Sequence, residues 1–229
     1  MSAGWLVFFV ILGCLVCHEA GHGLAATLLG VKVREVLVGL GPRLLSGRVG
    51  GVAVSLRALP VGAGVDVDDE SFAAAPLWKR VMLLLAGPLG NVAGCVVALA
   101  LLGWVWMGRP GWWMVWFALG GTARVLGATV AVLAGGPGEV VGPVGLAKMV
   151  SEMGGAPGTG FLVFACVSAG LAVFNLLPVV PLDGGRLLLE FMGGRVSPAA
   201  RRRAELCGAV LLGVLVVVVF LADLAKVLR

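Results

Sequence analysis

The chain has 229 residues, of which 60% are hydrophobic and only 13% are charged. Soluble domains contain about 45–50% apolar and about 25% charged residues, so a soluble fold could not cover these apolar side chains. The composition also excludes a disordered chain, and the 37 glycines have no three-residue period, which excludes a collagen-like fibre. It therefore predicts an integral membrane protein.

Four apolar stretches are long enough to cross a bilayer. A helix that spans the hydrocarbon core needs about 20 residues at a rise of about 1.5 Å each. The stretches that meet this length cover residues 5–29, 80–107, 161–183 and 207–224. They predict a single domain over residues 1–229 that is an all-α membrane fold, a polytopic bundle of about four transmembrane helices.

A further apolar stretch covers residues 112–133. It contains Arg124 together with Gly120 and Gly121. A charge at the centre of a bilayer costs at least about 2.5–3.5 kcal/mol on insertion scales. We therefore expect an interfacial helix at residues 112–133, with a membrane-spanning helix as the alternative.

Basic residues gather between the first and second spans and between the third and fourth, whereas no Lys or Arg precedes His18. By the positive-inside rule, this asymmetry predicts that both basic loops are cytoplasmic and that the N-terminus is outside, in the inner or plasma membrane of the cell. The net charge of +5 comes from these loops rather than from a basic surface stripe, so it does not indicate a nucleic acid partner. The expected surroundings are the lipid bilayer.

Residues 31–69, between the first two spans, have a different pattern. β-branched residues alternate with others at 31–34 and 52–57, and Gly-Pro and Gly-Gly pairs punctuate the segment. This pattern predicts a small antiparallel β-hairpin or sheet on the cytoplasmic side. Its apolar content predicts contact with the membrane, where its backbone groups must be paired within protein.

The first span contains His18-Glu19-Ala20-Gly21-His22. Residues four apart share one face of a helix, so both imidazoles can bind one metal ion with Glu19 beside it. Zinc takes His nitrogens at about 2.0–2.1 Å, and a catalytic site keeps one position for water, whose proton Glu19 would accept as general base. Three ionisable groups in an apolar span are costly, which favours a functional site over a chance match.

An overlapping motif, Cys14-x-x-Cys17-His18, fits the attachment pattern of a c-type haem and would indicate an electron-transfer module. That chemistry needs two accessible thiols, whereas these cysteines lie deep in an apolar stretch. It also leaves Glu19 and His22 unexplained. A haem absorbance band would distinguish this alternative from the metal-hydrolase interpretation.

The chain has only two histidines, so the candidates for a third metal ligand are Asp or Glu residues in other membrane segments. Asp223 ends the fourth span at the predicted outer face, where a solvated helix end is expected. Asp183 ends the third span on the cytoplasmic side, after a stretch in which Pro178 and Pro181 break helical pairing. An unwound stretch at membrane depth must be buried or line a cavity, so we predict that Asp183 completes the site.

These segments resemble the site-2 protease family of intramembrane zinc metalloproteases, and in particular its bacterial sigma-factor-regulating branch. HEAGH and NLLPVVPLDGG (residues 175–185) match the family's HExxH and NxxPxxxLDG motifs. LWKRVMLLLAGPLGNVAG resembles the start of its second core helix, and VVGPVGLAKMV resembles the element ahead of its third. The resemblance implies zinc as the cofactor, with these residues at the site: His18, His22 and Asp183 as ligands, Glu19 as catalytic base and Asn175 in substrate binding.

The resemblance also implies the reaction and the partner. The expected activity is hydrolysis of a peptide bond within or near the transmembrane segment of a membrane-anchored protein, such as an anti-sigma factor or a similar regulator. The β-hairpin region is expected to bind substrate by strand addition, within about residues 31–59. A PDZ domain, which this branch usually inserts after its second core helix, does not fit between residues 107 and 161 beside the interfacial helix.

Two other classes of function stay open. A catalytically inactive member of the same fold could act as a membrane scaffold, although the intact ligands and base argue against it. A metal transporter would need several carboxylates or histidines along a path, whereas this chain offers one cluster.

Overall fold

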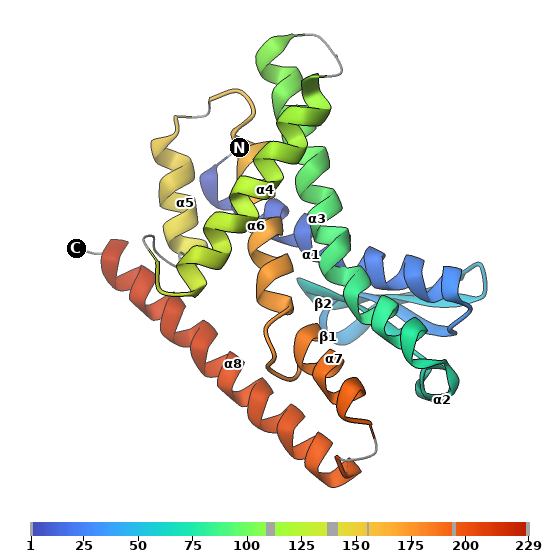
Figure 1. The fold of residues 1–229 in the computed structure, drawn as a ribbon. Helices are drawn as coiled ribbons and strands as arrows, with labels where there is room; N and C mark the ends of the chain where they lie inside the picture. Colours follow the sequence, from blue (N-terminus) through green and yellow to red (C-terminus); the bar gives the residue numbers. More distant parts are fainter. Residues whose placement is uncertain (1, 109–112, 137–141, 155, 194–195, 228–229) are drawn as a thin grey trace.

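A computed structural model describes residues 2–108, 113–136, 142–154, 156–193 and 196–227 (Figure 1). The helices are α1 (Ala3–Leu29), α2 (Asp69–Ala74), α3 (Leu77–Met107), α4 (Trp113–Leu133), α5 (Pro143–Glu152), α6 (Thr159–Asn175), α7 (Asp183–Met192) and α8 (Pro198–Val227). The strands are β1 (Val33–Val49) and β2 (Val52–Val67). The helices form a bundle, and the small sheet lies at one side of it.

Four helices, α1, α3, α4 and α8, are long and apolar enough to cross a membrane. Their outward faces carry large apolar side chains that are more than half exposed, including Leu24, Leu89, Trp116 and Val216. Such a surface would drive association in water, whereas acyl chains solvate it in a bilayer. The structure confirms the predicted fold class, a polytopic helical membrane protein with a small sheet.

Three of the predicted spans correspond to α1, α3 and α8; α1 and α3 begin two and three residues before the predicted starts, and α8 begins nine residues earlier and ends three residues later than predicted. The fourth, predicted over residues 161–183, is divided, because α6 ends at Asn175 and α7 begins at Asp183. Pro178 and Pro181 lie between these helices and have no N–H with which to continue a helix. Between α6 and α7 the chain therefore turns within the bundle instead of continuing as one helix.

Helix α4 packs along α3 and α6 (Figure 1). Its buried residue Ala118 shares a core with Leu99 of α3 and Ala165 of α6. The interfacial placement expected for residues 112–133 stays a prediction, and residue 112 lies outside the described residues. The length, composition and contacts of α4 favour the alternative, a helix that spans the membrane within the bundle.

The centre of the bundle is formed by α1, α3 and α6, which all contact one another. One buried cluster joins α3 to α4 and α6 and includes Cys95, Leu102 and Ala169. A second joins α1 to α5 and α6 and includes Val10 and Val150. Through these clusters α1, α3 and α6 pack together, and the ionisable residues of the first span lie on α1 within this packing.

The two strands bend, so that four segments of the sheet lie side by side. Residues 33–38 pair with residues 63–67 on one side in the antiparallel sense, and with residues 53–56 on the other side. In that second pairing the residue numbers rise together, so it is parallel. Residues 45–49 complete the sheet by antiparallel pairing beyond 53–56. The predicted sheet is present over residues 31–69, with an internal parallel pairing that residue alternation did not predict.

Glycines allow these bends. Gly39 and Gly62 have φ angles of 93° and 96°, a left-handed region that residues with a Cβ rarely adopt. The bends leave residues 63–67 at one edge of the sheet, paired on one side among the described strands. This edge faces α1.

Helix α8 lies along the outside of the bundle and is fixed near both ends (Figure 1). Near its start, Gly208 packs so closely on the carbonyl oxygen of Val180 that a methyl group there would overlap it. In the same region, Arg201 Nη2 donates to Glu190 Oε1 of α7 at 3.1 Å. The start of α8 is thereby attached to the irregular segment between α6 and α7.

Asp223 fixes the other end of α8. We expected a solvated helix end, but Asp223 is only 5% exposed, and its Oδ2 accepts a hydrogen bond from Gly145 N at 3.0 Å. Gly145 lies in the first turn of α5, whose N-terminal amide groups have no acceptor within that helix. Asp223 therefore caps α5 from another helix, a role that follows from tertiary packing.

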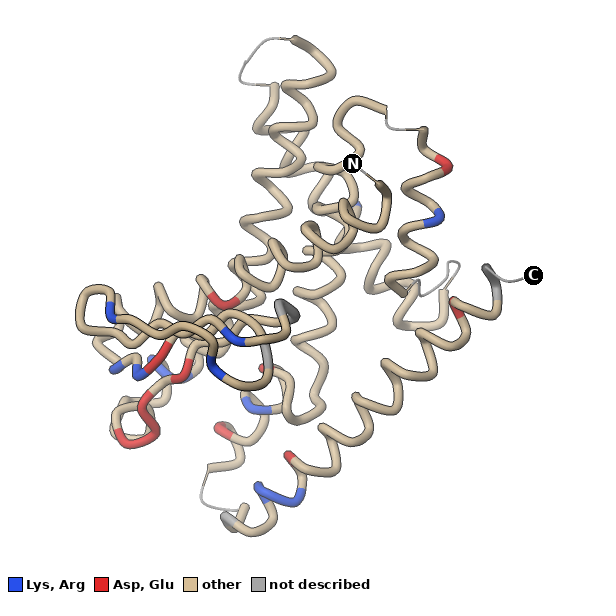
Figure 2. Tube along the Cα trace, turned by 180° about the vertical axis from the view of Figure 1, so that it is seen from behind, with Lys and Arg blue, Asp and Glu red and all other residues tan. Residues whose placement is uncertain are grey.

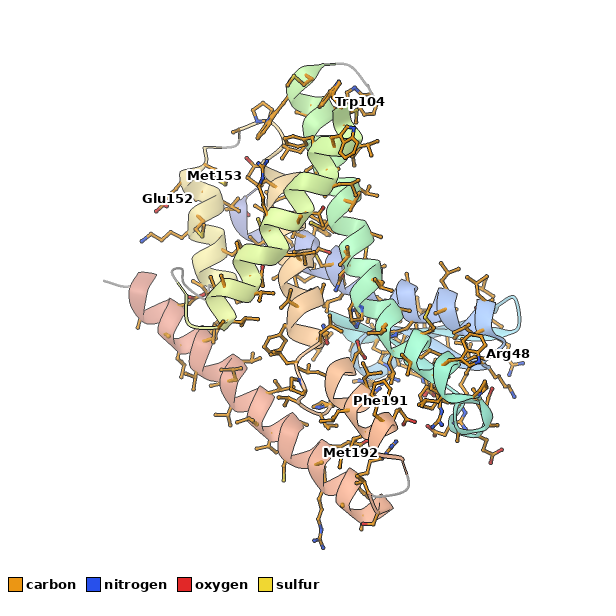
Figure 3. All side chains as sticks on the ribbon, in the orientation of Figure 1. Arg48, Trp104, Glu152, Met153, Phe191 and Met192 are labelled. Atoms are coloured by element: carbon orange, nitrogen blue, oxygen red, sulfur yellow. The ribbon has the colours of Figure 1, made fainter. Side chains whose placement is uncertain are left out.

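Charged residues gather around the sheet, α2 and the α7–α8 junction (Figure 2). Arg48 lies on the sheet, and Trp104 lies at the end of α3 that is far from the sheet (Figure 3). Trp104, Trp106 and Trp116 are all about half exposed or more, as an aromatic belt at a membrane interface requires. This polarity agrees with the predicted topology, whose sidedness stays a prediction.

Asp223→Ala is expected to lower the free energy of unfolding by about 1 kcal/mol, as the loss of a helix cap typically does. The measurement is the thermal unfolding midpoint of the detergent-solubilised protein. Asp223→Asn is the control, because its amide oxygen can still accept from Gly145 N. Equal midpoints for Asp223→Ala and the wild type would contradict the capping role.

Candidate metal centre

Helices α1 and α3 cross at very short range because both have glycines at the crossing. A methyl group on Gly21 of α1 would overlap Ala86 O, and one on Gly90 of α3 would lie 2.5 Å from Cys17 O. On Gly87 it would overlap the Nε2 atoms of both His18 and His22. Gly87 has no side chain, and the two imidazole rings occupy the space that a side chain at this position would fill.

The third member of the group comes from the broken segment between α6 and α7. Asp183 is the first residue of α7, and the two glycines that follow it pack on the backbone of the irregular segment. A methyl group on Gly184 would overlap Leu176 O, and one on Gly185 would overlap Val179. These close approaches turn the start of α7 toward α1.

The structure brings the three predicted ligands together. Asp183 Oδ2 lies 3.1 Å from His18 Nε2 and 3.3 Å from His22 Nε2, and the two Nε2 atoms are 3.2 Å apart. All three residues are buried. Asp183 Oδ2 is also a buried acceptor that receives no hydrogen bond from the described residues.

This geometry fits a zinc ion. Four ligands at about 2.0–2.1 Å from a tetrahedral centre lie about 3.3 Å from one another, close to the separations between these three atoms. Two nitrogen lone pairs and a carboxylate oxygen repel one another in an apolar interior unless a cation lies among them. Two histidines and one carboxylate leave the fourth position for water, as in catalytic zinc sites.

The ring of His22 is oriented by α3. His22 Nδ1 lies 2.9 Å from the backbone oxygen of Leu83, which can only accept, so Nδ1 carries the proton. Nε2 is then unprotonated and faces Asp183, which is the tautomer that a metal ligand requires. His18 Nδ1 also faces α3 and lies 3.1 Å from the side-chain amide Nδ2 of Asn91.

Glu19 lies beside the ligands and contacts the edge of the sheet. Its Oε2 accepts a hydrogen bond from Val65 N at 2.8 Å. Val65 belongs to the edge segment 63–67, whose other side pairs with residues 33–38. The part of the sheet next to Glu19 is therefore 63–67, outside the range 31–59 in which we expected strand addition.

A single cavity of about 630 Å³ contains the ligands and Glu19. The sheet edge and the α7–α8 junction also line it, and they contribute charged side chains that include Asp66, Arg186, Arg201 and Glu205. At its rim, Glu190 is 6% exposed and pairs with both Arg80 of α3 and Arg201 of α8. Polar groups thus extend from the buried ligands to the charged end of the molecule, a path that water can follow.

A family model described as Peptidase family M50 matches residues 6–220. The chain belongs to peptidase family M50. The resemblance to the site-2 protease family, deduced from HEAGH and NLLPVVPLDGG, is thereby confirmed.

Relatives of this M50 chain are named as metalloproteases. It is 34% identical over 114 residues to "Zinc metalloprotease Rip1" of Mycobacterium tuberculosis, covering 44% of this chain and 28% of the relative. The protein of the same name from Mycolicibacterium smegmatis is 32% identical over 118 residues, covering 44% and 29%. "Probable membrane metalloprotease ARASP2, chloroplastic" of Arabidopsis thaliana is 35% identical over 95 residues, covering 36% and 22%. The matched part spans less than a third of each relative.

Asn175, the last residue of α6, also lines the cavity of the M50 chain. Its Nδ2 donates to Leu171 O at 2.9 Å, one turn back along the helix. This bond fixes the side chain at the point where α6 ends, beside the segment that leads to Asp183. A role of Asn175 in substrate binding stays a prediction.

The haem interpretation is not supported by the positions of the two thiols. Cys14 is fully buried in the cluster that joins α1 to α5 and α6, and its Sγ lies 3.7 Å from Phe164 O. Cys17 is half-buried and packs near Gly94 of α3. These cysteines of the M50 chain fill the interior, and His18 of the same motif lies beside His22 and Asp183.

Sequence reasoning did not single out Gly87, Asn91 or Val65. Gly87 and Asn91 lie within the quoted LWKRVMLLLAGPLGNVAG segment, and their spacing of one helical turn places them on one face of α3. An asparagine in an apolar helix was a signal that could have found the contact with His18. Val65 had no such signal, because its contribution is a backbone N–H.

Gly87→Ala is expected to remove zinc from this M50 chain, because the added methyl group overlaps the Nε2 atoms of both histidines. The measurement is the zinc-to-protein ratio of the purified protein by elemental mass spectrometry. Gly120→Ala on α4 is the control, since a methyl group there meets no atom within 4 Å. A Gly87→Ala variant with the zinc content of the wild type would contradict the position of the site.

Proposed function

We propose that this chain is a zinc-dependent peptidase of the site-2 type, which hydrolyses a peptide bond within or near the transmembrane segment of a membrane-anchored protein. The observation that carries the proposal is the convergence of three ligand atoms within 4.8 Å of one another, in a cavity that also contains Glu19. The surrounding helices are apolar enough to lie in a membrane, which supports a substrate that is itself embedded there.

His18, His22 and Asp183 would hold the zinc ion. When bound, zinc polarises a carbonyl group and lowers the pKa of water to about 7, which makes that water a nucleophile near neutral pH. The chain supplies the rest of the chemistry. Glu19, adjacent to His18 and in the same cavity, accepts the proton of the attacking water and then donates a proton to the leaving amine.

The sheet edge supports binding of an extended substrate. A peptide bond inside a helix is shielded by helical hydrogen bonds, so the substrate must unwind before it reaches the site. The edge 63–67 presents backbone groups toward α1 and the cavity, and an extended peptide can pair with such an edge. Asn175, which also lines the cavity at the end of α6, is proposed to contact the same peptide.

The proposed placement is the inner or plasma membrane, with the N-terminus outside and the cavity toward the cytoplasm. It is supported by the basic residues of the sheet and of the α7–α8 junction, which lie at the charged end of the molecule (Figure 2). The resemblance to the sigma-factor-regulating branch supports regulated intramembrane proteolysis, with an anti-sigma factor or similar regulator as substrate.

Glu19→Gln is expected to abolish cleavage and to retain zinc, because the amide keeps the size of the side chain but cannot accept the proton of water. The measurement is quantitative proteomics of membrane fractions from cells that express either form. A single-span membrane protein should accumulate only with Glu19→Gln. Identical membrane fractions for the wild type, Glu19→Gln and cells without the chain would favour the catalytically inactive scaffold.

Asp183→Ala is expected to lose bound zinc and activity together, because it removes one of three ligands. The zinc content of the purified protein measures this loss. Asp66→Ala is the matched control, since Asp66 lines the same cavity but does not belong to the ligand group. Full zinc content in Asp183→Ala would remove this residue from the site.

A further inference from the structure

Asn91 is the one asparagine of α3, and it is fully buried at the metal centre. Its Nδ2 lies 3.1 Å from His18 Nδ1, and its Oδ1 lies 3.4 Å from Ser168 Oγ of α6. An amide buried in an apolar bundle is costly unless its hydrogen bonds are made. Asn91 therefore connects α6 to a predicted metal ligand on α1.

The contact with Ser168 determines which end of the amide faces His18. Ser168 has one hydroxyl proton, and its Oγ donates that proton to the backbone oxygen of Asn91 at 2.9 Å. With that proton used, Ser168 Oγ has only lone pairs for the amide, so exchanging the positions of Oδ1 and Nδ2 lets Nδ2 donate to Ser168 Oγ. The orientation of an amide is assigned from its partners, and the exchanged orientation puts Oδ1 where Nδ2 lies, 3.1 Å from His18 Nδ1.

This orientation fixes the tautomer of His18. An amide oxygen only accepts, so His18 Nδ1 carries the proton and Nε2 keeps its lone pair. Nε2 is the atom that lies 3.1 Å from Asp183 Oδ2 and 3.2 Å from His22 Nε2. His22 reaches the same tautomer by donating to Leu83 O. The two rings thus have different acceptors, a backbone carbonyl for one and a side-chain amide for the other.

We propose that Asn91, oriented by Ser168, is a positioning residue that accepts a hydrogen bond from His18 Nδ1 and aims His18 Nε2 at the metal. The inference rests on the proposed zinc site and adds to it the chain of contacts that sets one ligand. Partners of metal-bound histidines typically change metal affinity by about 10- to 100-fold when they are removed. His22 needs no such side chain, since its acceptor belongs to the backbone.

The first test compares the zinc affinities of full-length variants by competition with a chelator. Asn91→Leu keeps the size of the side chain and removes the acceptor, so its zinc affinity should fall about 10- to 100-fold. Asn91→Asp should retain wild-type affinity, because a carboxylate accepts from Nδ1–H. Thr122→Val is the matched control, a buried polar residue of α4 away from the site, and its affinity should equal that of the wild type.

The second test reads the tautomer directly. The chain has only two histidines, so labelling with ¹⁵N-histidine gives four ring signals. In the zinc-loaded wild type, both Nδ1 atoms should be protonated. In Asn91→Leu, the His18 signals should shift while those of His22 stay in place, which makes His22 an internal control against general unfolding.

The outcomes separate this inference from the proposed function. A wild-type protein that binds one zinc ion, with unchanged affinity and His18 signals in Asn91→Leu, overturns the role of Asn91 alone. An Asn91→Asp variant as weak as Asn91→Leu also overturns it, since the amide would then act as a donor. A wild-type protein that binds no zinc overturns the metal site and this inference together.

Discussion

A carboxylate held between two imidazoles in an apolar interior requires a cation among them, and the architecture around the site meets that requirement. Asp183 has no hydrogen-bond donor among the described residues, yet it lies within 3.3 Å of both histidines. Isolated burial of such a charge costs several kcal/mol. The i, i+4 spacing in α1 supplies two nitrogens, the break before α7 supplies the oxygen, and Gly87 leaves the volume for their meeting point.

Close helix packing and a small number of buried polar contacts also hold the rest of the molecule together. Helix packing in a membrane depends on close van der Waals contact and on a few buried polar bonds, because lipid solvates apolar side chains as well as protein does. Gly21 and Gly90 bring α1 and α3 into backbone contact at the level of the site. Glu190, paired with Arg80 and Arg201, joins α3, α7 and α8 at the rim of the cavity. Polar contacts are thus placed where helices must be held in register.

The sequence predicted those features that depend on local spacing or on the cost of charge in an apolar segment. HEAGH has its two histidines on one helical face, and Asp183 follows two prolines that break a span, so both features were visible in the sequence. Asp223 was misjudged because its partner, Gly145, is 78 residues away and contributes only a backbone N–H. The parallel pairing inside the sheet was likewise set by tertiary contacts, whereas the break between α6 and α7 follows from Pro178 and Pro181.

The hydrogen bond between Val65 and Glu19 has a consequence for timing. One N–H donates to a single acceptor at full strength, and in the free protein the Val65 N–H donates to the Glu19 carboxylate. A peptide that paired with this edge would compete for the same donor, and Glu19 would lose its restraint when the peptide arrived. Binding of a peptide to the edge would then also free the Glu19 carboxylate to act as a base. In the empty cavity, Glu19 would stay hydrogen-bonded to Val65 N.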